Sequence, residues 1–273
     1  NDPAQNQEQL TQLKKAVTFY ASFDSTLEAD YAAGDPRIYQ SESWEHRYES
    51  RAGLPSKGVV ERVSDEGRFG DALKINNRQA PVVHYKAEEN VSYHASDWHG
   101  TVSFWLKLDP DKDLEPGFSD PIQLTSRSWN DRCFFVDFTK DDSPRHFRFA
   151  AFSDRDIWDP DKRKWDDVPV EERPMVEISQ PPFSSEKWTH VCMTWANFNT
   201  GNADGILRCY LDGKQVGELV DRRITFTWEP NEALIWFGIN FQGWFDELII
   251  LNRDLSNDEV KFLYELPTGL TDL

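Results

Sequence analysis

The side chains best suited to chemistry lie on a predicted β-hairpin, residues 133–152. Its sequence, CFFVDFTKDDSPRHFRFAAF, alternates like a strand on both sides of a turn at DDSP. If the two strands pair so that Asp137 lies opposite Arg148, both share a face with His146. A carboxylate, a guanidinium and an imidazole together can bind a polar ligand or transfer protons.

The segment before this hairpin, PIQLTS, continues the same alternation and places Gln123 with the polar residues. This polar face is either exposed to solvent or the floor of a groove. In the exposed case, the pair of Asp137 and Arg148 contributes only about 0.2–1 kcal/mol. The opposite face is predicted to enter the core and carries Phe134, Val136, Phe138, Phe147 and Phe149.

Six of the 11 tryptophans fall in or beside polar loop segments, where most are expected to cover a core edge. Trp129 and Trp158 flank the hairpin, and an indole can stack on a sugar ring and also donate an N–H. Arg132 lies nearby and could bind a carboxylate or sulfate through both edges of its guanidinium, which would suit an acidic sugar. The predicted ligand-binding residues are Gln123, Trp129, Arg132, Asp137, His146, Arg148 and Trp158.

Motifs for catalysis are missing from the sequence. The acidic runs at 109–115 and 165–172 are loop-like and contain proline, so they do not place two carboxylates on one strand face as a glycosidase requires. Neither Gly-x-Ser-x-Gly, His-Glu-x-x-His nor a phosphate-binding glycine-rich loop occurs. The sequence favours binding without catalysis; an enzyme would use Gln123, Asp137, His146 and Arg148.

The formal net charge of −18 repels polyanions, so nucleic acid and anionic membrane surfaces are not expected as partners. An acidic excess suits solubility in an extracellular medium, and it also suits cation binding. No apolar run approaches the ~18 residues of a membrane span, so membrane insertion is not expected. The three cysteines fit no zinc motif, and pairing of Cys192 with Cys209 stays open.

The chain divides into a short leader, one domain and a tail. Residues 1–15 are predicted to be a polar linker or a short helix, and residues 17–23 alternate like a half-buried first strand. With no internal repeat, residues 16–266 are expected to form a single domain, and 267–273 a C-terminal tail. The chain shows no signal peptide and does not begin with Met, so we expect a processed or truncated form.

The stretch 243–264, GWFDELIILNRDLSNDEVKFLY, predicts a strand, a turn and a helix whose capping box joins Ser256 to Glu259. Its order of Gly, Asp-Glu, Asn-Arg, Leu-Ser and Glu resembles the closing motif of laminin-G-like domains in the concanavalin A-like lectin/glucanase superfamily. The strand WTHVCMTW at 188–195 also resembles the pentraxins in particular. Further similar segments are GRFGDALKI, HGTVSFWLKLD and LRCYLDGKQVG.

This resemblance implies an all-β antiparallel sandwich, a jelly roll with long loops and short peripheral helices. It implies that a poly- or oligosaccharide binds on the concave sheet of a lectin-like, non-catalytic module that is secreted or lies in the cell envelope. Two alternatives remain open: a polysaccharide lyase or glycoside hydrolase on the same face, and a module that binds a protein partner through an exposed apolar patch.

The resemblance also implies a structural Ca²⁺ held by Asp24, Asp246 and backbone carbonyls such as that of Gly70, because calcium prefers hard oxygen ligands. The open alternative is that Asp246 accepts hydrogen bonds from backbone N–H groups. At the position where a pentraxin would supply the partner of its strand cysteine, this chain has Ser103, so the pentraxin disulfide is not expected.

Overall fold

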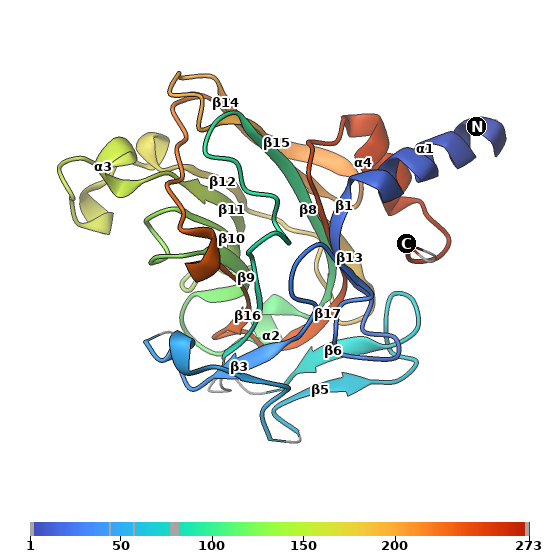
Figure 1. The fold of residues 1–273 in the computed structure, drawn as a ribbon. Coiled ribbons are helices and arrows are strands. Elements are labelled where there is room, and N and C mark those ends of the chain that lie inside the picture. Colours follow the sequence, from blue (N-terminus) through green and yellow to red (C-terminus); the bar gives the residue numbers. More distant parts are fainter. Residues whose placement is uncertain (1–2, 44, 57, 77–81, 271–272) are drawn as a thin grey trace.

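The computed structural model describes residues 3–43, 45–56, 58–76, 82–270 and 273. Most of these residues lie in strands of two antiparallel sheets, and the helices are short or peripheral (Figure 1). One large apolar core contains side chains from both sheets. The predicted all-β sandwich of the jelly-roll type is therefore confirmed.

Sheet A has nine strands, with β8 and β17 as neighbours near its middle. The β17 strand is the one predicted from the C-terminal motif, and it also pairs with β1, the predicted first strand. In order, sheet A contains β15 (Lys214–Arg222), β14 (Gly205–Leu211), β13 (Thr189–Phe198), β8 (Trp98–Lys107), β17 (Gly243–Leu251), β1 (Val17–Ala21) and β2 (Tyr31–Ala32), with β6 (Ala72–Ile75) and β5 (Val60–Val63) attached to β17 through β6.

Sheet B has eight strands and contains the predicted polar hairpin as β10 and β11. The strand that precedes this hairpin in sequence, β9, pairs with β10 on one side and with β16 on the other. In order, sheet B contains β12 (Met175–Ile178), β11 (Phe147–Phe152), β10 (Cys133–Phe138), β9 (Ser119–Thr125), β16 (Leu234–Ile239), β7 (Val82–Lys86), β3 (Tyr39–Ser41) and β4 (Arg51–Ala52).

Aromatic rings fill the core between the sheets. Trp98 on β8 packs edge-on against Trp195 of β13 and Phe134 of β10, with ring centroids 5.3 and 5.5 Å apart. Gly100 permits this packing, because a Cβ at that position would lie 2.1 Å from the Trp195 ring. The core therefore joins the two sheets through close contacts that tolerate little change in volume.

Two helices, α1 (Pro3–Ala16) and α4 (Asn257–Tyr264), cover the outer face of sheet A, where Leu13 and Val260 are buried. The predicted capping box is confirmed: the Ser256 hydroxyl accepts from the Glu259 backbone N–H, and the Glu259 carboxylate accepts from that of Ser256. No described helix is long and apolar enough to cross a membrane. The remaining helical turns are α2 (Pro110–Asp113), α3 (Arg155–Trp158), η1 (Arg47–Glu49), η2 (Trp165–Asp167), η3 (Val170–Glu172) and η4 (Pro230–Glu232).

All three cysteines are buried and unpaired. Cys192 belongs to the apolar cluster beneath the helices, whereas Cys209 belongs to the core between the sheets. Since they lie on opposite faces of sheet A, no disulfide can join them. Cys192 lies directly opposite Ser103 in the β13–β8 pair, and a serine cannot form the disulfide of the pentraxins.

Candidate functional site

The polar hairpin has the predicted register. Asp137 on β10 pairs with Arg148 on β11, and β9 places Gln123 opposite Phe135. The outer face of sheet B therefore carries the predicted polar residues. The side chains expected to face inward all lie in the main core: Phe134, Val136, Phe138, Phe147 and Phe149.

A pocket of about 280 Å³ opens on this outer face. At its mouth stand the two most exposed aromatic side chains of the lining, Trp129 at 40% and Phe118 at 37% exposure. Four predicted ligand-binding residues come together here: Gln123, Trp129, Asp137 and Arg148. The complete lining is Phe118, Asp120, Gln123, Trp129, Phe135, Asp137, Arg148, Trp165, Ile239 and Asn240.

A buried ion pair forms part of the pocket floor. The Arg148 Nε donates to Asp137 Oδ1 at 2.8 Å, and its Nη2 donates to Asp137 Oδ2. Both residues are less than a tenth exposed, and the guanidinium lies 4.8 Å from the ring centre of Phe118. The pair is therefore buried and bidentate, so the weak exposed salt bridge considered from the sequence is not what forms.

Asp120 is a pocket residue that the strand alternation did not predict. Alternation places it with the inward-facing residues of β9, but the β9–β10 register shifts so that Ser119 lies opposite Phe138. This bulge turns Asp120 towards the pocket, where its carboxylate accepts from the Gln123 side-chain amide. Burial raises the pKa of Asp120 to about 8, and the nearby carboxylate of Asp137 adds to the rise.

Arg145 holds the loop that leads into the pocket. The side chain is buried, and its guanidinium donates only to backbone carbonyls, most of them in the segment between α2 and β9. That segment ends at Phe118, so Arg145 fixes the aromatic side chain at the pocket mouth. The four acceptors are the carbonyls of Leu114, Glu115, Gly117 and Thr139, at 2.7 to 3.3 Å.

The long connection from β11 to β12 covers part of the outer face of sheet B. From it, Trp165 packs edge-on against Trp129 at a centroid distance of 5.3 Å, and Arg173 lies 4.3 Å from the Trp165 ring centre. Phe152, at the end of β11, packs against both rings. What remains accessible is a pocket bounded by this connection rather than an open groove.

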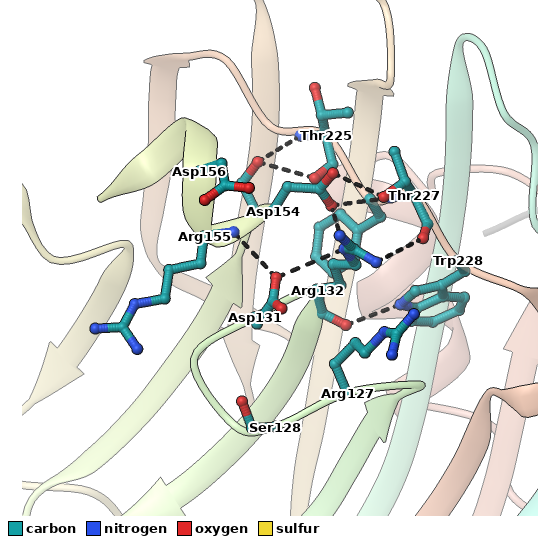
Figure 2. A network of polar contacts seen from close by, with 12 residues as sticks. Arg127, Ser128, Asp131, Arg132, Asp154, Arg155, Asp156, Thr225, Thr227 and Trp228 are labelled. Atoms are coloured by element: carbon teal, nitrogen blue, oxygen red, sulfur yellow. Dashed lines mark hydrogen bonds and ion pairs between the residues drawn. The ribbon is translucent and has the colours of Figure 1, made fainter. Parts of the chain in front are cut away.

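Three predicted ligand-binding residues lie outside the pocket lining, and Arg132 is the first. Its Nε lies 2.9 Å from an Asp154 carboxylate oxygen, and its backbone carbonyl accepts from the Trp228 indole (Figure 2). Asp154 in turn accepts from the backbone N–H and the hydroxyl of Thr227. Figure 2 shows that this network joins three loops, so the guanidinium is engaged within the protein.

Trp158 and His146 are the other two. The Trp158 indole donates to the Asn130 carbonyl at 2.9 Å and packs edge-on against Phe152. His146 Nδ1 lies 2.7 Å from a carboxylate oxygen of Glu177, at the turn end of the hairpin. Trp158 therefore supports the connection from β11 to β12 that covers part of sheet B, and His146 forms a polar contact with the neighbouring strand.

Around the predicted calcium residues, the structure shows a loop held by carboxylates. Asp246 accepts from two backbone N–H groups of loop 67–71, at 2.6 and 3.2 Å, and from the backbone N–H of Glu247 at 2.9 Å. Asp24 accepts from the last N–H of the same loop at 2.8 Å. Gly70 has φ +52°, and a Cβ there would lie 2.0 Å from the Asp24 carboxylate.

The backbone-acceptor role considered for Asp246 is thus the one observed. Among the described residues, no group of three or more His, Cys, Asp or Glu side chains is placed to hold a metal. Burial raises the pKa of Asp246 to about 9 and that of Glu247 to about 8, so these carboxyls carry a real desolvation cost. Calcium binding by Asp24, Gly70 and Asp246 stays a prediction.

Residues 85–261 match the laminin G model described as the concanavalin A-like lectin/glucanases superfamily. The match covers more than half of the chain, and it includes both the polar hairpin and most of the C-terminal motif. The chain belongs to this superfamily, as the sequence resemblance predicted. Among curated protein sequences, none matches it.

Solved structures with this fold include domain 4 of AbnA, an extracellular arabinanase from Geobacillus stearothermophilus, in complex with arabinotriose (TM-score 0.55, 15% identity, 92% of this chain and 98% of that one). The binding domain of Paraclostridial Mosquitocidal Protein 1 has TM-score 0.56 at 16% identity over 93% of this chain. The botulinum neurotoxin serotype D ligand binding domain, in complex with N-acetylneuraminic acid, has 0.57 at 12% over 94%. This chain spans about half of each toxin domain, and at such identities the likeness shows the fold alone.

Proposed function

We propose that this chain is a non-catalytic carbohydrate-binding module, and that a sugar unit enters the sheet B pocket between Phe118 and Trp129. The observation that carries the proposal is this pocket itself, with two exposed rings at its mouth and hydrogen-bonding groups at its floor. Sugar rings present the same combination, since their C–H faces stack on aromatic rings and their hydroxyls need polar partners.

The size of the pocket indicates how the sugar is held. At about 280 Å³ it lies at the lower end of the range for ligand sites, roughly 300–1,000 Å³. It suits one unit or one end of a glycan, with the remainder of the chain outside. Two proteins with this fold, the arabinanase domain and the serotype D toxin domain, are described in complex with sugars.

Catalysis is less well supported than binding. A glycosidase needs two carboxyl groups that can face the scissile bond, whereas both oxygens of Asp137 are engaged by Arg148. A lyase on this face would need a base, and His146 lies outside the pocket lining. Asp120 alone is left as an ionisable group for the substrate, which suits recognition.

A protein-binding role has weaker support for a different reason. Among the described residues, the exposed large apolar side chains other than Phe118 and Trp129 lie on separate elements. They therefore do not indicate one apolar patch for a protein partner. We place the module outside the cytoplasm, in a secreted or cell-envelope setting, because the superfamily resemblance implies it. The proposed partner is a poly- or oligosaccharide.

Isothermal titration calorimetry against a panel of oligosaccharides tests the proposal. We expect one sugar class to bind, Trp129→Ala and Phe118→Ala to weaken binding at least about ten-fold, and no product to form. Tyr31→Ala is the matched control, because Tyr31 is 41% exposed but lies on sheet A. Equal losses of sugar affinity in Tyr31→Ala and Trp129→Ala would refute a binding site at this pocket. Formation of a reaction product would show that the protein is an enzyme rather than a binding module.

A further inference from the structure

We propose that the pocket selects uncharged sugars and discriminates against uronic, sialic and sulfated ones. This inference rests on the proposed function, since it names the class of sugar that the same pocket takes. It also departs from the expectation, raised by the arginines of the sequence, that an acidic sugar could bind here.

The cation on the pocket floor is already neutralised. Arg148 directs Nε and Nη2 at the two oxygens of Asp137, and both residues are buried. A ligand carboxylate would have to displace Asp137 to gain a bidentate contact. The other arginine predicted for the ligand, Arg132, contacts Asp154 outside the pocket lining.

Cations near the mouth are also engaged. The ammonium of Lys140 lies 5.6 Å from the Phe118 ring centre and 3.4 Å from a carboxylate oxygen of Asp141. Arg173, above Trp165, donates to the backbone carbonyls of Val168 and Trp165. Backbone carbonyls thus engage Arg173, and Asp141 offsets the charge of Lys140 in an exposed ion pair. The overall charge of −18 adds a repulsion for anions approaching from solvent.

The group that remains for a ligand is a carboxyl. Asp120 accepts from Gln123 through one oxygen, and its other oxygen is available to a ligand in the pocket. Because the Gln123 amide nitrogen donates to Asp120, its carbonyl oxygen is oriented as an acceptor. Sugar hydroxyls can donate to the Asp120 carboxyl and to the Gln123 carbonyl oxygen. A carboxylate or sulfate has only acceptors, and Asp120 repels it once ionised, which the raised pKa of about 8 shifts to mildly alkaline pH.

The test compares sugars that differ at C6 alone, such as cello-oligosaccharides with β-1,4-linked glucuronate oligomers and methyl α-galactoside with methyl α-galacturonide. Titration calorimetry is run at pH 9, above the pKa of about 8 of Asp120, so that this carboxyl is ionised. We expect the neutral member of the preferred pair to bind roughly ten-fold or more tightly than the acidic one. Asp120→Asn should narrow this ratio, while Asp221→Asn, an exposed acid on β15, removes the same charge elsewhere and should leave it unchanged.

A second variant, Asp137→Asn, removes the carboxylate that pairs with Arg148 and should raise the affinity for the acidic sugar relative to the neutral one. If Asp137→Asn does not fold, Asp120→Asn still tests the inference. Equal or tighter binding of the acidic member to the wild-type chain would overturn the inference and leave sugar binding intact. An unchanged ratio in Asp120→Asn would also overturn it. If neither member of any pair binds, the proposed function fails, and the inference fails with it.

Discussion

Arg145 does not line the pocket, but its hydrogen bonds affect both the stability of the fold and the shape of the pocket mouth. Replacing it by Met keeps much of the buried aliphatic stem and removes the guanidinium, together with four hydrogen bonds to backbone carbonyls. The segment that these bonds hold carries Phe118 into the pocket mouth. We therefore predict that Arg145→Met lowers both thermal stability and sugar affinity.

The magnitude follows from the hydrogen bonds. A bond from a charged donor contributes about 1.5–3 kcal/mol when it is buried, but carbonyls released near the surface regain water. A net loss of about 3 kcal/mol is expected for the set. Over 273 residues, an unfolding entropy of about 2.1 cal/mol/K per residue converts this loss into a fall in Tm of about 5 °C.

Differential scanning fluorimetry and calorimetric titration with the best sugar measure both effects. The affinity should fall roughly ten-fold, because an unanchored loop must be ordered on binding. Arg145→Lys should lie between wild type and Met, since an ammonium cannot reach four carbonyls as the planar fork does. Arg223→Met is the control at an exposed arginine. A Tm and an affinity equal to wild type in Arg145→Met would refute the anchoring role.

Three further predictions concern the core and the buried carboxyls. Because burial raises the folded-state pKa values of Asp246, Glu247 and Asp120 to about 9, 8 and 8, the unfolded chain releases these protons first, and the unfolding free energy should fall from pH 7 to pH 9. Asp246→Asn should reduce the slope of that fall in urea titrations, and an unchanged slope would contradict the assignment. The buried histidines, His84 and His190, have lowered pKa values of about 4 and 3 and act only below pH 7, so they do not mask the effect. Gly100→Ala should cost about 1–3 kcal/mol, since its Cβ would overlap the buried Trp195 ring; an unchanged urea midpoint would show that the ring can move. Calcium should raise the Tm if Asp24, Gly70 and Asp246 bind it, EDTA and Asp24→Ala should abolish the rise, and no shift with calcium would remove the site.

The predictable parts of the molecule were those set by local pattern. Alternation along residues 133–152 fixes which side chains face the core, and it gave the pairing of Asp137 with Arg148 correctly. The capping box at Ser256 was equally local, because both of its hydrogen bonds join residues three apart. Such features depend on short-range geometry, which the sequence carries directly.

The site residues that were missed or assigned the wrong role depend on longer-range structure. Asp120 reaches the pocket only because a bulge shifts the β9–β10 register, whereas strict alternation from Gln123 would direct it inward. Arg132 and Trp158 were predicted to contact a ligand. In the fold, Arg132 instead contacts Asp154, and Trp158 donates to the Asn130 carbonyl, each from a neighbouring loop. Arg145 gave no signal, since its partners are backbone carbonyls that any sequence would supply.

The most direct test of the central claim is a crystal structure of the chain with the tightest-binding oligosaccharide. We predict one sugar ring against Trp129 and Phe118, with a hydroxyl within hydrogen-bonding distance of Asp120 and the Asp137–Arg148 pair intact. Sugar density at another surface, with the pocket on sheet B empty, would contradict it.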